Sequence, residues 1–181
     1  MHIVDPAKPP REAPVTRIRF LTGAGAALAG RFLLRRGLLA KLRRDVARLN
    51  GGDHRPLLAG YAADAVLRFN PGDHRWAGEH RGKPAIERFL RNFTAAGLHG
   101  EIKDLWVGGP PWALTMVARF DNAAEAPDGT PIYANRTCLV VRTHWGKIVE
   151  HEDFYEDTGR ILALEARLRE LGIAPVGPGP A

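Results

Sequence analysis

The chain has 181 residues, of which 45% are hydrophobic and 25% are charged, a composition typical of one globular domain. Its net charge is +6, but residues 1–60 carry 12 Lys or Arg against 4 Asp or Glu, whereas residues 61–181 carry 14 against 16. We therefore expect no nucleic-acid binding by the main body. The single cysteine, Cys138, excludes an internal disulfide and a thiolate zinc site, as expected of a cytoplasmic protein.

Residues 1–30 are predicted to form a basic N-terminal arm. Its proline-rich start has no apolar periodicity, and the apolar stretch over 20–34 is interrupted by Arg31 and too short to span a membrane. Over residues 32–49, apolar side chains recur at three- and four-residue steps, which predicts an amphipathic helix. The opposite face of this helix carries five arginines: Arg35, Arg36, Arg43, Arg44 and Arg48. They could contact an anionic membrane, but we do not expect this, because the apolar stripe is needed to cover the sheet.

The rest of the chain is predicted to contain helices first and consecutive strands afterwards. Helices are expected over residues 53–62 and 84–97, with a strand over 65–69 between them. Strands follow over residues 99–107, 112–120, 132–143 and 147–155, and a last helix over 157–172 precedes a Pro/Gly tail. This order predicts an α+β fold. The main domain is expected over residues 31–160, with the C-terminal helix and tail over 161–181.

Several common kinds of site are not supported by the spacing of their residues. The glycine-rich stretch over residues 22–27 lacks the third glycine of a dinucleotide-binding turn. The loop with Asp73, His74, Glu79 and His80 lacks the helical spacing of a zinc site and is typical of a solvated turn. The chain contains no serine, which excludes a serine nucleophile. We therefore expect neither a metal nor a cofactor.

The last predicted strand carries a cluster of proton-transferring side chains. Because side chains alternate along a strand, His151, Asp153 and Tyr155 are expected on one face. Neighbouring strands offer Arg119 with Asp121, and Arg136 with Cys138. Two interpretations remain open at this point. These groups form either an acid/base site or a structural network of ion pairs.

Three stretches of the sequence resemble the SnoaL-like branch of the nuclear transport factor 2-like superfamily. They are residues 61–69, 77–86 and 146–151, and the resemblance covers roughly residues 33–160. It implies a cone in which three N-terminal helices pack on a strongly curved antiparallel sheet and enclose an apolar cavity, with an extra C-terminal helix here. It also implies a homodimer without a cofactor. Members of the family include polyketide cyclases, ketosteroid isomerase and limonene epoxide hydrolase.

Two of these activities make different demands on the sequence. Aligned with the isomerase, the general-base position falls on Phe69 and the oxyanion-hole acid on Cys138, so the resemblance does not imply that mechanism. A cyclase-type reaction needs one acid or base on the last strand, a role that Asp153 or His151 can fill.

The epoxide hydrolase provides a closer match at one site. Its Arg-x-Asp strand matches Arg119 and Asp121, and its late-strand aspartate matches Asp153. The side chains that hold its water correspond to Leu67 and Phe69, which cannot bind water. The resemblance thus implies part of that site.

Together, these observations predict a pocket for a small, mostly apolar molecule with one or two oxygen functions. The residues expected to line it are Tyr61, Leu67, Phe69, Trp76, Arg136, Cys138, His151, Asp153 and Tyr155. The function expected is that of a cofactor-independent isomerase, cyclase or epoxide hydrolase, with Asp153, His151, Asp121 and Arg119 as catalytic residues. The alternative is a non-catalytic binding or scaffold protein that uses the same cavity.

Overall fold

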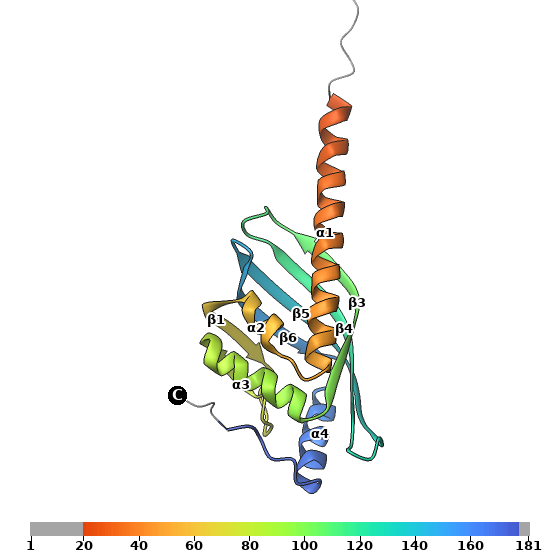
Figure 1. Ribbon diagram of the computed structural model, residues 1–181, viewed down its shortest axis with the longest axis vertical. Coiled ribbons are helices and arrows are strands. Elements are labelled where there is room, and N and C mark those ends of the chain that lie inside the picture. The colour runs from red at the N-terminus through yellow and green to blue at the C-terminus, as the bar shows by residue number, and fades with distance from the viewer. Residues whose placement is uncertain (1–19, 178–181) are drawn as a thin grey trace, which may run out of the picture. The chain divides into compact units, whose positions relative to one another are not determined.

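The computed structural model describes residues 20–177, which form four helices and six strands (Figure 1). They fall into two units that meet within helix α1 (Phe20–Asn50), one ending at Leu34 and the other beginning at Arg35. The predicted arm lies outside the described residues up to position 19, and from Phe20 the chain is helical. The remaining elements are α2 (Arg55–Gly60), β1 (Tyr61–Phe69), β2 (Gly78–Arg81), α3 (Gly82–Ala95), β3 (Leu98–Gly108), β4 (Thr115–Glu125), β5 (Pro131–His144), β6 (Lys147–Tyr155) and α4 (Thr158–Glu170).

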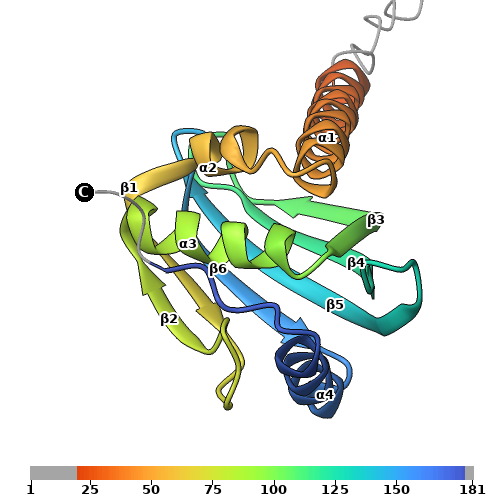
Figure 2. The ribbon, with the colours of Figure 1, turned by 60° about the horizontal axis from the view of Figure 1, so that its bottom comes forward.

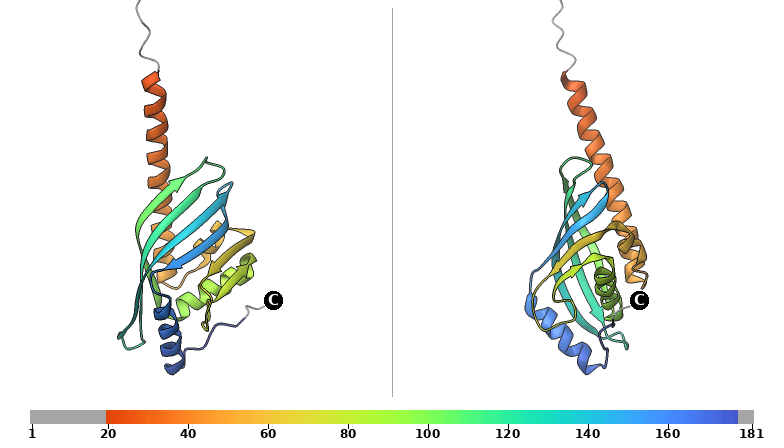
Figure 3. Two further views of the ribbon diagram at one scale, coloured as in Figure 1. Left: turned by 180° about the vertical axis from the view of Figure 1, so that it is seen from behind. Right: turned by 90° about the vertical axis from the view of Figure 1, so that its left-hand side faces the viewer.

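The six strands form one curved sheet in the order β2-β1-β6-β5-β4-β3 (Figure 3). Helix α3 crosses one face of this sheet (Figure 2). The predicted α+β class is confirmed. All neighbouring strands are antiparallel except β1 and β6, which run parallel. This pairing places the first strand of the chain beside the last one.

The bounds of several elements differ from those predicted, for local reasons. Helix α1 is longer than the predicted 32–49, because the alanines before Arg31 favour helix and no proline interrupts them. Strand β4 begins at Thr115 instead of residue 112, because a turn precedes it. That turn requires glycine at Gly109, where φ is +87° and a Cβ would lie 2.5 Å from the Ala113 carbonyl oxygen. Strand β2 was not predicted, since its four residues are too few to show alternation.

Two apolar clusters form the core within residues 35–177. The first lies among β1, α3 and α4 and includes Leu67, Ile86, Leu90, Ile161, Leu164 and Leu168. The second packs the C-terminal half of α1 on β3 and β4 and includes Leu38, Leu42, Val46, Ile102, Leu105 and Phe120. The apolar stripe predicted for α1 thus covers the sheet from Leu38 onward.

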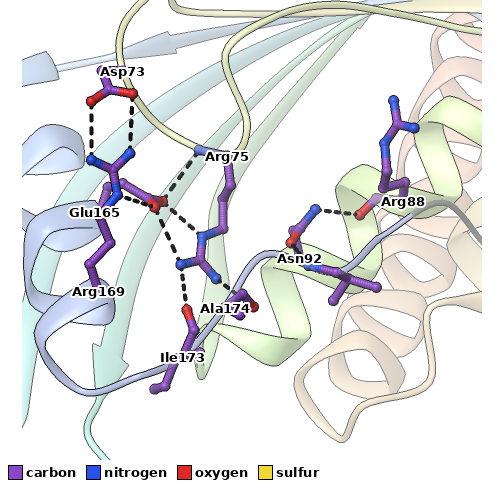
Figure 4. Close-up of polar contacts among 9 residues, drawn as sticks. Asp73, Arg75, Arg88, Asn92, Glu165, Arg169, Ile173 and Ala174 are labelled. Atoms are coloured by element: carbon purple, nitrogen blue, oxygen red, sulfur yellow. Dashed lines mark hydrogen bonds and ion pairs between the residues drawn. The ribbon is translucent and has the colours of Figure 1, made fainter.

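Helix α4 is fixed to the loop between β1 and β2 by a buried ion pair (Figure 4). Arg75 Nε donates to Glu165 Oε2 over 2.8 Å, and the two side chains are 0% and 2% exposed. Arg75 also donates to the Ile173 carbonyl oxygen, which holds the chain after α4. Arg169 extends the network by binding both Glu165 and Asp73. Burial raises the pKa of Glu165, but the hydrogen bonds from Arg75 outweigh this effect, and the pKa lies below its usual value of 4.5.

We predict that Glu165→Gln lowers the free energy of unfolding at neutral pH by about 3–5 kcal/mol, because Arg75 is then buried without a counter-charge. Since the pKa of Glu165 is lowered on folding, its stabilising contribution is present above about pH 4.5 and is lost as the pH falls further. Urea unfolding between pH 3 and 7 should therefore show a weaker acid dependence for the variant than for the wild type.

The matched control is Glu170→Gln in the same helix, because the Glu170 side chain is 64% exposed. It should change the free energy of unfolding by less than about 0.5 kcal/mol. Equal effects of the two substitutions would contradict the role assigned to the buried pair.

Candidate functional site

A cavity of about 130 Å³ lies on the helix-covered face of the sheet, within the unit that begins at Arg35. The C-terminal half of α1, helix α3 and strands β3 to β6 supply most of its wall. Its apolar lining includes Leu42, Val46, Leu49, Phe89, Phe93, Leu105, Met116, Ala118, Phe120, Leu139, Val141 and Ile148. A few polar side chains interrupt this lining, as is usual in sites for small molecules.

The central polar group of the cavity is formed by Tyr61, His151 and Asp153. The parallel pairing of β1 with β6 brings Tyr61 to the last strand, and its hydroxyl lies 2.5 Å from His151 Nδ1. His151 Nε2 lies 2.7 Å from Asp153 Oδ1, within ion-pair distance. The two atoms are not aligned for a hydrogen bond, and neither has another hydrogen-bond partner among the described residues. A buried donor and a buried acceptor are therefore left at the cavity wall.

Tyr61 determines which nitrogen of His151 carries the proton in the neutral ring. Burial, assisted by the charge of Asp153, raises the pKa of Tyr61 well above its usual value, so its hydroxyl remains protonated. We assign this hydroxyl as the donor to Nδ1, which places the hydrogen of neutral His151 on Nε2. The Nε2–H group then faces Asp153 and the cavity.

A second polar edge of the cavity is formed by Tyr155 and Asn122. Burial is the main cause that raises the pKa of Tyr155 well above its usual value, and the Thr137 side chain partly offsets this effect. Thr137 Oγ1 also accepts a hydrogen bond from Asn122 Nδ2 over 2.6 Å. Gly100 makes room for this amide, because a Cβ at that position would lie 2.9 Å from Asn122 Oδ1.

The residues that line the cavity include no Lys or Arg within the described part of the chain. Across residues 20–177, no group of three or more His, Cys, Asp or Glu side chains is placed to hold a metal ion. The polar groups present can therefore exchange protons and hydrogen bonds with a ligand, but they do not provide a counter-charge for an anion.

The structure brings four of the predicted residues together at the cavity: Tyr61, His151, Asp153 and Tyr155. Their common face agrees with the alternation predicted for the last strand. Leu67, Phe69 and Trp76 are buried on the same side of the sheet but belong to the adjacent core. Phe69 and Trp76 border a smaller void beside α4, so they do not line the main cavity.

Arg119, Asp121, Arg136 and Cys138 do not join this site. The strand register explains why, since Leu139 lies opposite Asp153, whereas Cys138 lies opposite Phe154 on the other face. Arg119 and Asp121 flank the inward-facing Phe120 and point away from the cavity as well.

The four side chains have other contacts on that outer face. Arg119 binds Asp104 over 3.1 Å, Asp121 lies 3.5 Å from Lys103, and Arg136 donates to Glu156 over 2.7 Å. Cys138 is partly exposed in a shallow hollow beside Phe154. The expected pairing of Arg119 with Asp121 near Asp153 is therefore wrong.

Asn50 and Asn122 were missed by the sequence analysis. Asn122 could have been found from the alternation in its strand. Ala118, Phe120 and Asn122 alternate with the charged Arg119 and Asp121, which indicates that the first three face inward. Asn50 lies at the end of the predicted helix, where no local signal links it to the cavity. Its amide exchanges two hydrogen bonds with the Gly100 backbone, of 2.9 and 3.0 Å.

Comparison with known proteins yields one family and several structures of the same fold. The model of the SnoaL-like domain matches residues 42–151. No curated protein shows significant similarity to the sequence. A nuclear transport factor 2-like protein from Burkholderia pseudomallei is 19% identical with a TM-score of 0.57, over 70% of this chain and 95% of that one.

Two further structures have the same fold. A proposed polyketide cyclase from Xanthomonas campestris pv. campestris is 17% identical with a TM-score of 0.51, over 72% of this chain and 98% of that one. TerC, co-crystallised with polyporic acid, is 15% identical with a TM-score of 0.56, over 70% of this chain and 97% of that one. At these identities, the comparisons establish the fold alone.

We predict that neutral His151 carries its hydrogen on Nε2 in the wild type, and that Tyr61→Phe mixes the two tautomers because the donor to Nδ1 is lost. Long-range ¹H–¹⁵N correlation spectra of the imidazole ring report this directly. The substitution should also lower the free energy of unfolding by about 1–3 kcal/mol, since Nδ1 is left buried without a partner.

Tyr155→Phe is the control, because the Tyr155 side chain lines the same cavity, whereas the hydroxyl that bonds His151 Nδ1 is that of Tyr61. It should leave the tautomer of His151 unchanged. A wild-type ring with its hydrogen on Nδ1 would refute the assignment.

Proposed function

Because the chain belongs to the SnoaL-like family, we propose that it binds a small, mostly apolar molecule in this cavity and transfers protons on it without a cofactor. The observation that carries the proposal is the buried group of Tyr61, His151 and Asp153 at the wall of an otherwise apolar cavity. His151 Nε2 and Asp153 Oδ1 have no well-aligned hydrogen bond among the described residues, so a ligand oxygen beside them would find both a donor and an acceptor.

The lining favours an uncharged ligand. No Lys or Arg faces the cavity from the described residues, while Asp153 places an acidic group there. A carboxylated or phosphorylated ligand would therefore be buried next to a second acidic group without an arginine or lysine to pair with. A ketone, quinone or phenol instead offers an apolar body with one or two oxygens that accept or donate hydrogen bonds.

The geometry supports proton transfer next to a carbonyl group. Asp153 Oδ1 would accept a proton from a carbon beside the carbonyl, and the Nε2–H of His151 would donate a hydrogen bond to the oxygen as negative charge develops on it. The proton on Asp153 then returns to another carbon of the ligand, which completes an isomerisation, or to the oxygen after ring closure. Tyr61 holds the ring of His151 in the orientation that this role needs.

Other family activities receive less support from this site. The epoxide hydrolase arrangement needs an arginine beside two carboxylates, whereas Arg119 and Asp121 lie on the outer face. In the alignment with the isomerase, Phe69 stands in place of the general base and Cys138 in place of the oxyanion-hole acid. Neither side chain lines the cavity. A cyclase-type reaction is therefore the best supported, and the names of two structural relatives, a proposed polyketide cyclase and a protein crystallised with polyporic acid, agree with an oxygenated cyclic ligand.

We predict that Ala118→Phe abolishes ligand binding, because Ala118 is 4% exposed and lines the cavity, which the added ring would fill. The measurement is calorimetry with those aromatic ketones or phenols that raise the melting temperature of the wild type. Ala123→Phe places the same ring on the outer face of the same strand and should leave binding unchanged. Equal affinities for all three proteins would exclude this cavity as the binding site.

We predict that Asp153→Asn slows deuterium exchange at the α-carbon of a bound ketone by about two to four orders of magnitude, because the amide cannot accept the proton. Proton NMR in deuterated buffer measures this rate without knowledge of the natural substrate. Asp121→Asn, on the outer face, is the control and should exchange at the wild-type rate.

Two outcomes of this experiment would count against catalysis. If Asp153→Asn exchanges as fast as the wild type, Asp153 is not the base. If the wild type binds ketones but catalyses no exchange, the cavity binds its ligand without reacting with it.

A further inference from the structure

The N-terminal half of α1 differs in its side chains from the half that covers the sheet. From Phe20 to Leu34, the helix contains 15 residues, of which Arg31 alone is charged. Side chains from Ala29 to Leu34 are exposed, and Leu33 is 68% exposed. Adjacent exposed apolar side chains, here Leu33 and Leu34, are typical of a surface that binds a partner.

The charge around this stretch has one sign. Between residues 13 and 44, the sequence contains eight Lys or Arg and no Asp or Glu. Arginines lie directly before the apolar stretch, at Arg17 and Arg19, and directly after it, at Arg35 and Arg36. The Nε of Arg35 donates to the Leu105 carbonyl oxygen over 2.7 Å, so Arg31 is the arginine of this segment that the test addresses. The complementary partner is therefore negatively charged at its surface and apolar beneath it, which describes a membrane with acidic lipids.

The sequence analysis expected no membrane contact, because the apolar stripe over residues 32–49 was assigned to the sheet. In the structure, that argument applies only from Leu38 onward, where the stripe packs on β3 and β4. Leu33 and Leu34 belong to the other unit and remain exposed. The stripe residues that pack on the sheet therefore begin at Leu38, and the leucines at 33 and 34 are exposed.

This segment is suited to the interfacial layer of a membrane. No helix within residues 20–177 is both long and apolar enough to cross a bilayer. A shorter apolar helix can lie along the boundary between headgroups and acyl chains, while arginines extend their guanidinium groups to the lipid phosphates. We propose that residues 20–36 of α1 bind the surface of an anionic membrane.

The test is cosedimentation of the full chain with vesicles of phosphatidylcholine that contain about 30% phosphatidylglycerol. We expect binding at low ionic strength, weaker binding at 0.5 M NaCl and little binding to pure phosphatidylcholine, because acidic lipid attracts each basic residue by about 1 kcal/mol near the surface and salt screens this attraction. Arg31→Gln should weaken binding about fivefold, and the double variant Leu33→Gln/Leu34→Gln at least about tenfold.

Matched control variants lie elsewhere on the protein surface. Arg88→Gln removes one exposed charge from α3, and Leu162→Gln replaces a leucine of α4 that is 44% exposed. Both should bind vesicles as the wild type does. Circular dichroism and the melting temperature of each variant establish that it is folded.

Three results would overturn the proposal. The first is no sedimentation of the wild type with acidic vesicles at low salt, and the second is undiminished binding by the Leu33→Gln/Leu34→Gln variant. The third is a wild-type protein that self-associates in the absence of lipid and becomes monomeric in that variant, which would make a second copy of the chain the partner of this segment.

Discussion

The parallel pairing of β1 with β6 is the contact on which the candidate site depends. It joins the first strand of the fold to the last, and it aligns Leu67 with His151. With that register, the hydroxyl of Tyr61 reaches the imidazole of a residue 90 positions later in the chain. Without this pairing, the Tyr61 hydroxyl would not reach His151 Nδ1, and neither the orientation of the ring nor its Nε2–H tautomer would be fixed. The chemistry of the cavity therefore depends on a long-range backbone pairing as much as on the side chains themselves.

The same sheet separates two chemically different surfaces. On the face beneath the helices, apolar side chains surround a few neutral or acidic polar groups. On the other face, Arg119, Lys103 and Arg136 each meet a carboxylate at or near the protein surface. Exposed ion pairs of this kind contribute only about 0–1 kcal/mol each to the free energy of unfolding. Substitution of these charged residues should therefore leave the protein folded. None of these three cations lines the cavity.

The parts of this structure that follow from short-range rules were accessible from the sequence. Alternation placed His151, Asp153 and Tyr155 on one face, and helical periodicity identified the stripe of α1 that packs on the sheet. The errors concern which strand residues line the cavity, because this depends on the register between neighbouring strands. Arg119 and Asp121 were assigned to the cavity because they match the Arg-x-Asp strand of the epoxide hydrolase, although Phe120 between them occupies the inward position.

The remaining gaps have a similar cause. Asn50 and the Arg75–Glu165 pair join elements separated by 50 and 90 positions, and nothing in the neighbouring sequence indicates these partners. Family resemblance supplied the overall arrangement, but it could not supply contacts that are specific to this chain. Such contacts are formed by single side chains, for which a pattern of several residues gives no signal.

The amide of Asn50 has a consequence for how this protein behaves in a crowded solution. Strand β3 lies at the edge of the sheet and is 11 residues long, enough to pair with a strand of another molecule. Asn50 bonds both the N–H and the carbonyl oxygen of Gly100, which are the groups that an incoming strand would use. The end of α1 thus occupies the place of a neighbouring strand at Gly100, and an incoming strand would have to displace the Asn50 amide to pair there.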